Sequence, residues 1–243
     1  MPIAPTCNIY HLGTVDYLSA WEIQRELVQW VADGQQPNSL LLLEHQPVYT
    51  MGRRGTRAQV LLSDSQLSER GIALTESDRG GEVTYHGPGQ LVAYPVLDLK
   101  QWGGPVKYVR TLEQVMIKTL ADFGVVAGLV EGITGVWVEG SKAHLERSRK
   151  IAAIGVRIRR GVCHHGLALN VNTDLSYFQH IVPCGMEGGE VTSMESLLGN
   201  HVDMDTVAYS LVYHLGIGMG FRMVEAECLP DGLDSALTSS KRG

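Results

Sequence analysis

Four strand-like segments follow one another between residues 125 and 172 with no helix-like segment between them. They cover residues 125–131, 135–139, 150–160 and 162–172, and each is rich in β-branched and other apolar side chains. Antiparallel strands can be joined by a short turn, whereas parallel strands need a crossover of about a dozen residues or more. This run therefore predicts an antiparallel or mixed sheet and argues against a doubly wound parallel fold.

Helical periodicity flanks this run on both sides. Apolar residues between positions 18 and 31 recur at helical spacing after Asp16, and a second such face, at residues 106–120, ends at Gly124. Shorter patterns predict helices at residues 63–70, 193–198 and 203–215, and strands at residues 39–43 and 91–99. We therefore expect the α+β class, with a mixed, largely antiparallel sheet flanked by helices.

The length and composition predict one large domain. Of 243 residues, 44% are hydrophobic and 19% charged, which suits a sizeable core. We expect a single domain over residues 1–228 and a flexible tail over residues 229–243, which are rich in small and polar side chains. Neither a long apolar run nor a basic, then apolar, N-terminal segment is present. The sequence thus predicts no membrane association or secretion and favours a cytoplasmic location.

Charge and cysteine usage narrow the choice of partners. The net charge of −6 argues against wholesale nucleic-acid binding, although residues 147–160 carry six basic side chains and no acidic one. That basic stretch is interpreted either as a site for an acidic partner or as the solvated face of a hairpin. The four cysteines are widely spaced and form no Cys-x-x-Cys pair, which argues against a disulfide framework or a zinc ribbon.

Glycines, an arginine and a histidine gather at residues 79–91, and we interpret this segment as the rim of a pocket. Its glycines allow tight turns and close approach to a ligand, while Arg79 and His86 supply polar groups. No Gly-Lys-Ser/Thr sequence and no dinucleotide fingerprint is present, so phosphate cradling is not predicted. The alternative is a hairpin turn with glycines at positive φ.

Lys150 begins a strand whose alternation places it on the same face as Ala152 and Ile154, with Arg157 and Arg159 on the opposite face. Unless a bulge shifts the register, this lysine points toward the interior, where burial favours the neutral amine and makes it a candidate base. The alternative is that Lys150, at the start of the strand, extends past the sheet edge into solvent.

The next strand places small residues, Gly166 and Ala168, on one face, which would leave room for a slender apolar ligand. Cys163, His164 and His165 suggest metal ligands, but neighbouring strand residues point to opposite faces, so no metal site is predicted. Cys184 lies between Pro183 and Gly185 in a constrained loop, where its sulfur can face a pocket; an isolated cysteine can equally be a small buried hydrophobe.

Together these segments closely resemble the lipoyl(octanoyl) transferase family, which shares the fold of biotin and lipoate protein ligases. The resemblance covers most of the chain. It rests on residues 79–91 (RGGEVTYHGPGQL), 150–155 (KIAAIG), 165–171 (HGLALNV), 183–185 (PCG) and 191–193 (VTS). Members of that family move an octanoyl group from acyl carrier protein to a lysine of the lipoyl domains of 2-oxoacid dehydrogenases and of the glycine-cleavage H protein.

The resemblance implies a biotin/lipoate protein ligase-like fold and a role for each matching residue. Cys184 would form the acyl thioester and Lys150 would tune it, with no cofactor or metal. The implied substrate contacts are Arg79, Gly80, Gly81, Glu82, Val83, Thr84, Tyr85, His86, Ala153, Ile154, Gly155, Gly166, Leu167 and Ala168. The basic stretch would meet the acidic carrier protein. An added polar loop at residues 140–149 and the segment 186–190 do not match the family pattern.

Two other functions remain open from the sequence. An ATP-dependent lipoate or biotin protein ligase of the same fold would activate a free acid as an adenylate and would not need Cys184. A non-enzymatic protein that binds acyl chains or lipoyl domains would need neither Cys184 nor Lys150. The presence of both residues favours the transferase.

Overall fold

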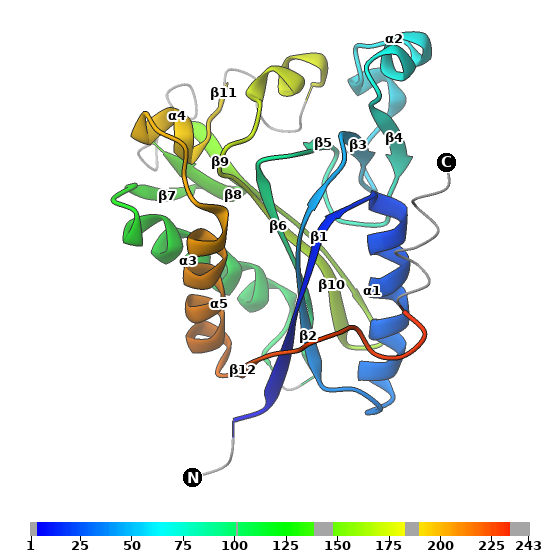
Figure 1. The fold of residues 1–243 in the computed structure, drawn as a ribbon, viewed down its shortest axis with the longest axis vertical. Coiled ribbons are helices and arrows are strands. Elements are labelled where there is room, and N and C mark those ends of the chain that lie inside the picture. The colour runs from blue at the N-terminus through cyan, green and yellow to red at the C-terminus, as the bar shows by residue number, and fades with distance from the viewer. Residues whose placement is uncertain (1–3, 101, 139–147, 183–189, 234–243) are drawn as a thin grey trace.

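The computed structural model of this chain describes residues 4–100, 102–138, 148–182 and 190–233 (Figure 1). In chain order its elements are β1 (Thr6–Val15), α1 (Tyr17–Ala32), β2 (Asn38–His45), β3 (Val48–Met51), η1 (Arg57–Gln59), α2 (Asp64–Glu69), β4 (Ala73–Glu76), β5 (Val83–His86), β6 (Gln90–Val96), α3 (Pro105–Asp122), β7 (Ala127–Val130), β8 (Ile133–Val138), β9 (Arg149–Arg159), β10 (Val162–Asn170), η3 (Leu175–His180), β11 (Glu190–Val191), α4 (Met194–Leu198), α5 (Met204–Met219) and β12 (Arg222–Glu225).

The larger sheet is mixed but mostly antiparallel. In the described ranges it has nine strands, in the order β12-β1-β2-β6-β10-β9-β8-β7, with β11 paired to β9. Strand β1 runs parallel to β2 and β12, and β11 runs parallel to β9. The neighbouring strands in the rest of the order, β2-β6-β10-β9-β8-β7, are all antiparallel. The predicted α+β class with a largely antiparallel sheet is therefore confirmed.

Helices cover both faces of this sheet. Figure 1 shows α1 on one face and α3 with α5 on the other. Each face has its own core: α1 packs on the sheet through Ile23, Leu27 and Val31, and the opposite core contains Leu112 of α3 and Leu211 of α5.

Local sequence signals explain how the two long helices begin. The Asp16 side chain accepts a hydrogen bond from the backbone N–H of Ser19 at 2.9 Å, which caps α1. Helix α3 begins with Pro105 in its first turn, after Gly104 at a φ of 92°. Val106 was predicted on the buried face of α3, but it lies in the first turn of the helix and is 75% exposed.

A smaller sheet of order β4-β3-β5 carries the glycine-rich segment. Its own core includes Tyr49, Leu67 and Tyr85. The backbone N–H of Gly52 donates to the carbonyl of Glu82 at 3.0 Å, and a Cβ at Gly52 would lie 2.5 Å from the oxygen of Gly81. These contacts hold the segment from 79 to 82 against the turn after β3.

A bulge changes the face on which Lys150 lies. Val136 of β8 pairs with Ala152, whereas Trp137 pairs with Lys150, so Ile151 is an extra residue in β9. Ile151 and Ala152 are both buried in the core beneath α3. The predicted alternation, with Lys150 on the face of Ala152, is therefore wrong, and Lys150 lies on the opposite face of the sheet.

The C-terminal residues that are described stay packed on the protein. Within the predicted tail, Leu229 and Leu233 are buried in the core beside α1, and residues 234–243 lie outside the described ranges. The division into one domain at residues 1–228 and a flexible tail stays a prediction. Among the helices of the described ranges, none combines the length and the apolar character needed to span a bilayer.

Candidate active site

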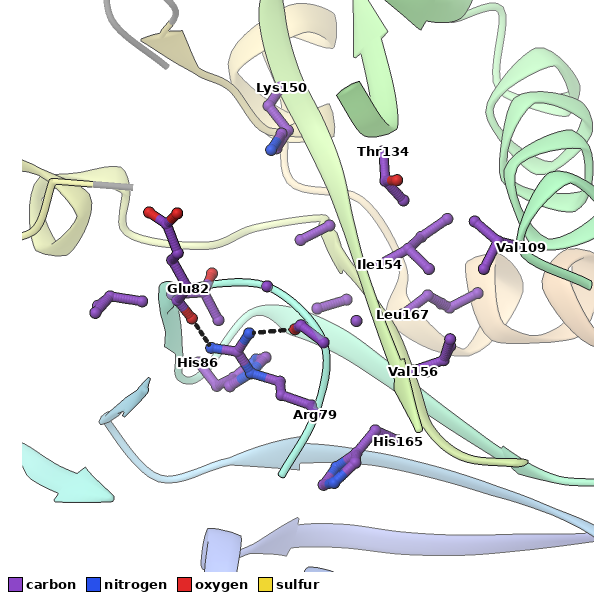
Figure 2. A pocket seen from close by; sticks show the side chains of 18 of the residues that line it. Arg79, Glu82, His86, Val109, Thr134, Lys150, Ile154, Val156, His165 and Leu167 are labelled. Atoms are coloured by element: carbon purple, nitrogen blue, oxygen red, sulfur yellow. Dashed lines mark hydrogen bonds between the residues drawn. The ribbon is translucent and has the colours of Figure 1, made fainter. Parts of the chain in front are cut away.

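A cavity of about 480 Å³ opens between the glycine-rich segment, strands β9 and β10 and the side of α3 (Figure 2). The predicted residues that line it are Arg79, Gly80, Gly81, Glu82, Val83, Thr84, His86, Lys150, Ala153, Ile154, Gly155, Gly166, Leu167 and Ala168. The structure therefore brings together nearly all the residues that the sequence motifs indicated, although their roles in binding stay predictions.

One predicted site residue, Tyr85, does not line this cavity, and another, Cys184, cannot be placed because it is outside the described ranges. Tyr85 is 1% exposed and its ring stacks on that of Tyr177, with centroids 4.5 Å apart, in the core of the smaller sheet. Cys184 lies outside the described residues, as do most of the polar loop at 140–149 and most of the segment 186–190.

Arg79 is a structural residue of the rim. Its side chain is buried, and its guanidinium donates to the carbonyl of Thr50 at 2.6 Å, to that of Glu82 at 2.7 Å and to that of Gly80 at 2.9 Å. Its Nε also donates to the Thr50 hydroxyl at 3.0 Å. These bonds show that Arg79 shapes the backbone of the rim, and its predicted contact with substrate stays a prediction.

His86 is a neutral imidazole in a buried hydrogen-bond chain. Its Nδ1 donates to Gln90 Oε1 at 2.7 Å, and Gln90 Nε2 donates to Asn170 Oδ1 at 2.9 Å. Burial, with the nearby His45 and Arg79, holds the pKa of His86 well below its usual value. With its Nδ1 proton engaged, the uncharged ring has only an acceptor nitrogen left, so it is poorly suited to stabilise an oxyanion.

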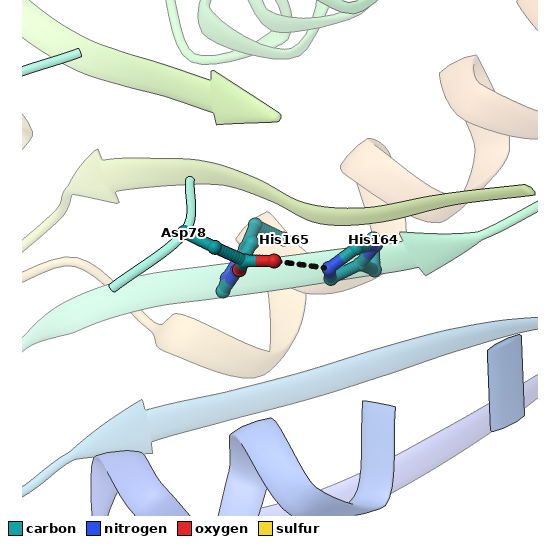
Figure 3. A group of neighbouring side chains, drawn as sticks. All are labelled: Asp78, His164 and His165. Atoms are coloured by element: carbon teal, nitrogen blue, oxygen red, sulfur yellow. Dashed lines mark hydrogen bonds and ion pairs between the residues drawn. The ribbon is translucent and has the colours of Figure 1, made fainter. Parts of the chain in front are cut away.

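Asp78, which the motifs did not indicate, meets two neighbouring histidines of β10 (Figure 3). Its carboxylate lies 2.7 Å from His165 Nε2 and 3.5 Å from His164 Nε2. Both rings reach it because His165 has a φ of 54°, which interrupts the strand alternation. The prediction that these two side chains point to opposite faces is wrong for this reason.

The groups around Asp78 favour a hydrogen-bonded cluster of neutral histidines on a charged carboxylate over a metal site. The hydrogen bond from His165 is the main cause that lowers the pKa of Asp78 to about 2, and burial lowers the pKa of His164 to about 4. The three groups offer ligand atoms within 4.8 Å of one another. However, Arg157 Nε lies 3.9 Å from the same carboxylate, and its charge opposes a further cation.

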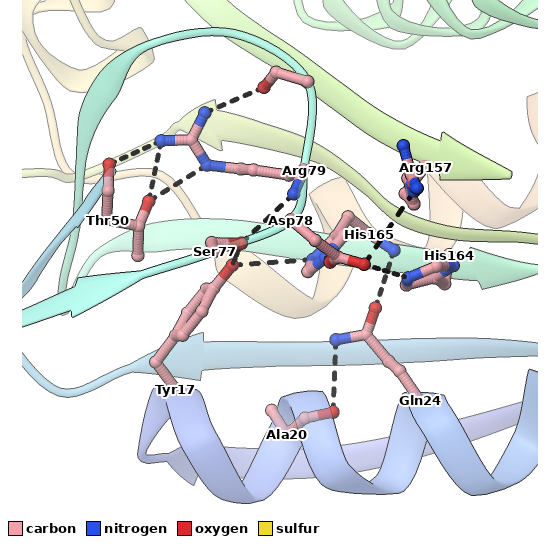
Figure 4. Close-up of polar contacts among 11 residues, drawn as sticks. Tyr17, Ala20, Gln24, Thr50, Ser77, Asp78, Arg79, Arg157, His164 and His165 are labelled. Carbon is pink, nitrogen blue, oxygen red and sulfur yellow. Dashed lines mark hydrogen bonds and ion pairs between the residues drawn. The ribbon is translucent and has the colours of Figure 1, made fainter. Parts of the chain in front are cut away.

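Helix α1 holds this cluster against the cavity (Figure 4). The Tyr17 hydroxyl lies 2.7 Å from that of Ser77, and Ser77 Oγ accepts from the backbone N–H of Arg79 at 3.3 Å. Gln24 Oε1 accepts from the backbone N–H of His165 at 2.7 Å. These bonds fix Ser77, which precedes the rim, and His165, which lines the cavity, to helix α1.

Lys150 extends from the bulge of β9 into the cavity (Figure 2). Its Nζ lies 4.6 Å from the centroid of the Trp137 ring. Strand β11 runs beside it: Val191 pairs with Lys150, and the backbone N–H of Thr192 donates to the Lys150 carbonyl at 2.9 Å. The chain therefore resumes next to Lys150 directly after the segment that contains Cys184.

The basic stretch does not form one surface in the structure. Arg157 faces Asp78, and Arg160 binds Asp33 at 2.7 Å, whereas Arg149 lies at the other end of β9, about 30 Å away at the usual rise of a strand. Arg159 is exposed, and Arg147 lies outside the described residues. Among the described residues of this stretch, Arg159 is the best candidate for contact with an acidic partner.

The cavity has further lining residues that the sequence reasoning missed. They include His165, Asn170, Gln90, Tyr94, Val109 and Thr134. His165 and Asn170 belong to the HGLALNV motif, which was the available signal for them. Val109 and Thr134 come from α3 and β8, and only the tertiary fold brings these elements to the cavity.

The α+β fold and the glycine-rich rim of the cavity indicate one class of protein, the lipoyl protein ligase-like enzymes. The sequence profile of the lipoyl protein ligase A/B catalytic domain matches residues 16–216, and the chain belongs to this family. Within it, the chain is 47% identical to the octanoyltransferase of Chloroflexus aggregans over 223 residues, which cover 91% of this chain and 98% of the relative. It is 48% identical to that of Solibacter usitatus over 224 residues, covering 92% and 97%. The chain is therefore an acyltransferase.

Solved structures confirm the predicted biotin/lipoate protein ligase-like fold. The bi-partite lipoate protein ligase of Thermoplasma acidophilum is similar with a TM-score of 0.72 at 16% identity, over 98% of this chain and 92% of that one. Biotin protein ligase from Aquifex aeolicus is similar with a TM-score of 0.52 at 13% identity, over 88% and 70% of the two chains. At these identities the likeness concerns the fold alone.

Proposed function

We propose that this enzyme transfers an octanoyl group from acyl carrier protein to a lysine of a lipoyl domain, through a thioester on Cys184. The observation that carries this proposal is the position of Lys150, which projects into the cavity beside the strand that follows the Cys184 segment. We propose octanoyl as the transferred group because the similar proteins are octanoyltransferases. Ala153, Gly155 and Leu167 give the cavity a narrow apolar surface suited to an alkyl chain.

The first half-reaction needs a thiolate. A free thiol has a pKa of about 8.5 and is only a few per cent ionised near neutral pH, so a nearby ammonium on Lys150 would raise the thiolate fraction. The thiolate of Cys184 attacks the carbonyl carbon of the donor thioester, and the pantetheine sulfur leaves as the carbon–sulfur bond breaks. The leaving thiolate takes the proton of the Lys150 ammonium, so pantetheine departs as a thiol and Lys150 becomes a neutral amine. One thioester replaces another, so the step requires no ATP.

The second half-reaction needs a base. The amine of the acceptor lysine attacks the acyl-Cys184 carbonyl, an amide bond forms, and the cysteine sulfur leaves. Lys150 in its neutral form accepts the proton of the attacking amine. Because an amide is more stable than a thioester, this step is favourable. The neutral His86 is a weak candidate for the oxyanion site, which leaves backbone N–H groups as the expected donors.

The acceptors that we propose are the lipoyl domains of 2-oxoacid dehydrogenases and the glycine-cleavage H protein. They follow from the family resemblance and from the acyl chemistry of the relatives. The cytoplasmic location predicted from the sequence stays a prediction.

Intact-protein mass spectrometry tests the covalent step. The protein is mixed with octanoyl-acyl carrier protein without ATP, beside a Cys184→Ala variant. An octanoyl adduct that hydroxylamine removes, present on the native chain and missing on the variant, is expected. Full transfer by the variant would overturn the thioester mechanism. Modification of a lipoyl domain only with ATP and free octanoate or lipoate would support a ligase, and inactivity in both assays a binding protein.

A further inference from the structure

Lys150 and Trp137 form a cross-strand pair that the bulge of β9 creates. They are direct partners in the register of β8 and β9, and the Lys150 Nζ lies 4.6 Å from the centroid of the indole ring. Without the extra residue Ile151, alternation would turn Lys150 to the other face of the sheet. The bulge therefore sets the lysine over the face of this ring.

The space for the lysine stem comes from a glycine. Gly135 has a φ of 127°, and a Cβ there would lie 2.9 Å from the Ala152 carbonyl oxygen and 3.4 Å from Lys150 Cε. Its backbone N–H donates at 3.2 Å to Oε1 of Glu113, a fully buried residue of α3. Helix α3 thus fixes the part of β8 against which the Lys150 side chain lies.

Trp137 itself is almost completely buried. It is 1% exposed, so the ring is held by its surroundings rather than by the lysine. A cation above an indole face is attracted by the ring quadrupole, most strongly where water is displaced, whereas a neutral amine is attracted much less. The pair therefore favours the ammonium form of Lys150 in this cavity, against the effect of burial.

We infer that Trp137 is a positioning residue that holds Lys150 over its ring as the ammonium ion and thereby sets the balance between the two half-reactions. This inference rests on the proposed function, because it assigns the lysine to Cys184. A stabilised ammonium promotes the thiolate needed for acylation. The same stabilisation opposes the neutral amine needed as a base in the transfer to the acceptor.

The pH dependence of thiol alkylation provides the first test. Cys7 and Cys163 are buried and burial raises the pKa of each to about 12, so a Cys228→Ser background leaves Cys184 as the reactive thiol. In that background Trp137→Leu is expected to shift the alkylation midpoint upward by up to about one pH unit, and Trp137→Phe by less. An unchanged midpoint in a folded Trp137→Leu protein would overturn the inference.

A second cation–π pair supplies the matched control. Lys107 Nζ lies 4.7 Å from the Trp102 ring centroid, and neither residue lines the cavity. Trp102→Leu removes an indole of the same kind and is expected to leave the alkylation midpoint of Cys184 unchanged. A shift of equal size in this variant would show that general loosening, rather than the pair with Lys150, is responsible.

The two half-reactions give a readout that a merely structural role would not produce. In single-turnover experiments, Trp137→Leu is expected to slow acylation several-fold while transfer from the preformed acyl-enzyme is unchanged or faster. Equal slowing of both steps contradicts the inference. If Trp137→Leu does not fold, Trp137→Phe decides in the same way. A wild-type protein that forms no adduct would instead refute the proposed function.

Discussion

The carboxylate of Asp78 and the imidazole of His165 form a 2.7 Å hydrogen bond between residues that are 87 positions apart in the chain. Asp78 precedes the glycine-rich rim, and His165 opens the motif on β10 that lines the cavity. Their bond joins the smaller sheet to the larger one at the candidate active site. Because the bond favours the charged carboxylate, it lowers the pKa of Asp78 to about 2.

Asp78→Asn is expected to destabilise the protein near neutral pH, and less so in acid. The folded-state pKa of about 2 is below the usual value of about 3.9, so the stabilisation is complete above about pH 4 and is lost as the pH falls toward 2. Since the side chain is 41% exposed, solvent screening limits the effect to about 1 kcal/mol. Urea unfolding of both proteins at pH 6 and pH 3 measures it.

Asp64→Asn is the control for this experiment. Asp64 also has an ion pair, 2.9 Å from Arg57, but its side chain is 88% exposed. Its loss should change the free energy of unfolding little at either pH. If Asp78→Asn behaved in the same way, the bond to His165 would not hold the two sheets together.

Buried neutral histidines predict a loss of stability in mild acid. Burial lowers the pKa of His45 and of His164 to about 4, below the unfolded value of about 6.5. The unfolded chain therefore binds protons first, so stability is complete above about pH 6.5 and falls as the pH approaches 4. The urea midpoint should be clearly lower at pH 5 than at pH 7.5.

His45→Gln should reduce that pH dependence. His45 donates from Nδ1 to the Val15 carbonyl and accepts at Nε2 from the Tyr94 hydroxyl, each at 2.8 Å, so protonation would break the second bond. A glutamine at this position carries no titrating group. The variant is expected to be less stable at pH 7.5 but to lose less on acidification, and an unchanged slope would contradict this account.

The main helices were predictable from their apolar periodicity, and the positions of β9 and β10 from their long apolar runs, but the faces on which their side chains lie were not. The bulge at Ile151 was not predictable, since Ile151, Ala152 and Ala153 fit a buried face equally well and alternation gives no signal there. Strand β1 was also missed, because a register irregularity between His11 and Gly13 interrupts its pattern.

The motifs indicated the cavity residues well, but not what each side chain does. The motif gave no sign that Arg79 also holds the rim through its bonds to backbone carbonyls, and its contact with substrate stays a prediction. Asp78 and Trp137 carried no signal, because their importance depends on partners from other strands: His165 and Lys150. Pairings of this kind are properties of the tertiary structure.

Gly166→Ala is expected to destabilise the protein by at least about 2 kcal/mol. The glycine was predicted to leave room for a ligand, but a Cβ there would lie 2.3 Å from the Ala93 carbonyl oxygen and 2.6 Å from Pro95 Cδ. The missing side chain thus allows β10 to approach β6. Gly128→Ala, in β7, has no atom within 4 Å of the new Cβ and serves as the control. Equal urea midpoints for the two variants would contradict this interpretation.

Arg159→Glu is expected to weaken use of the acyl carrier protein. Arg159 is exposed at the end of β9, whereas Arg157 and Arg160 already face Asp78 and Asp33. If its charge attracts the acidic carrier, reversal should raise the apparent KM for octanoyl-carrier several-fold at low salt and leave kcat nearly unchanged.

Added salt tests whether this effect is electrostatic. The difference in KM between the native protein and Arg159→Glu should shrink as ionic strength rises, because exposed charges are screened within about 10 Å at 0.1 M salt. Lys118→Glu, an equal charge reversal at an exposed position of α3, is expected to leave KM unchanged. A similar rise in KM in both variants would mean that net charge alone attracts the carrier. An unchanged KM in both would mean that the end of β9 is a solvated face with no role in binding the carrier.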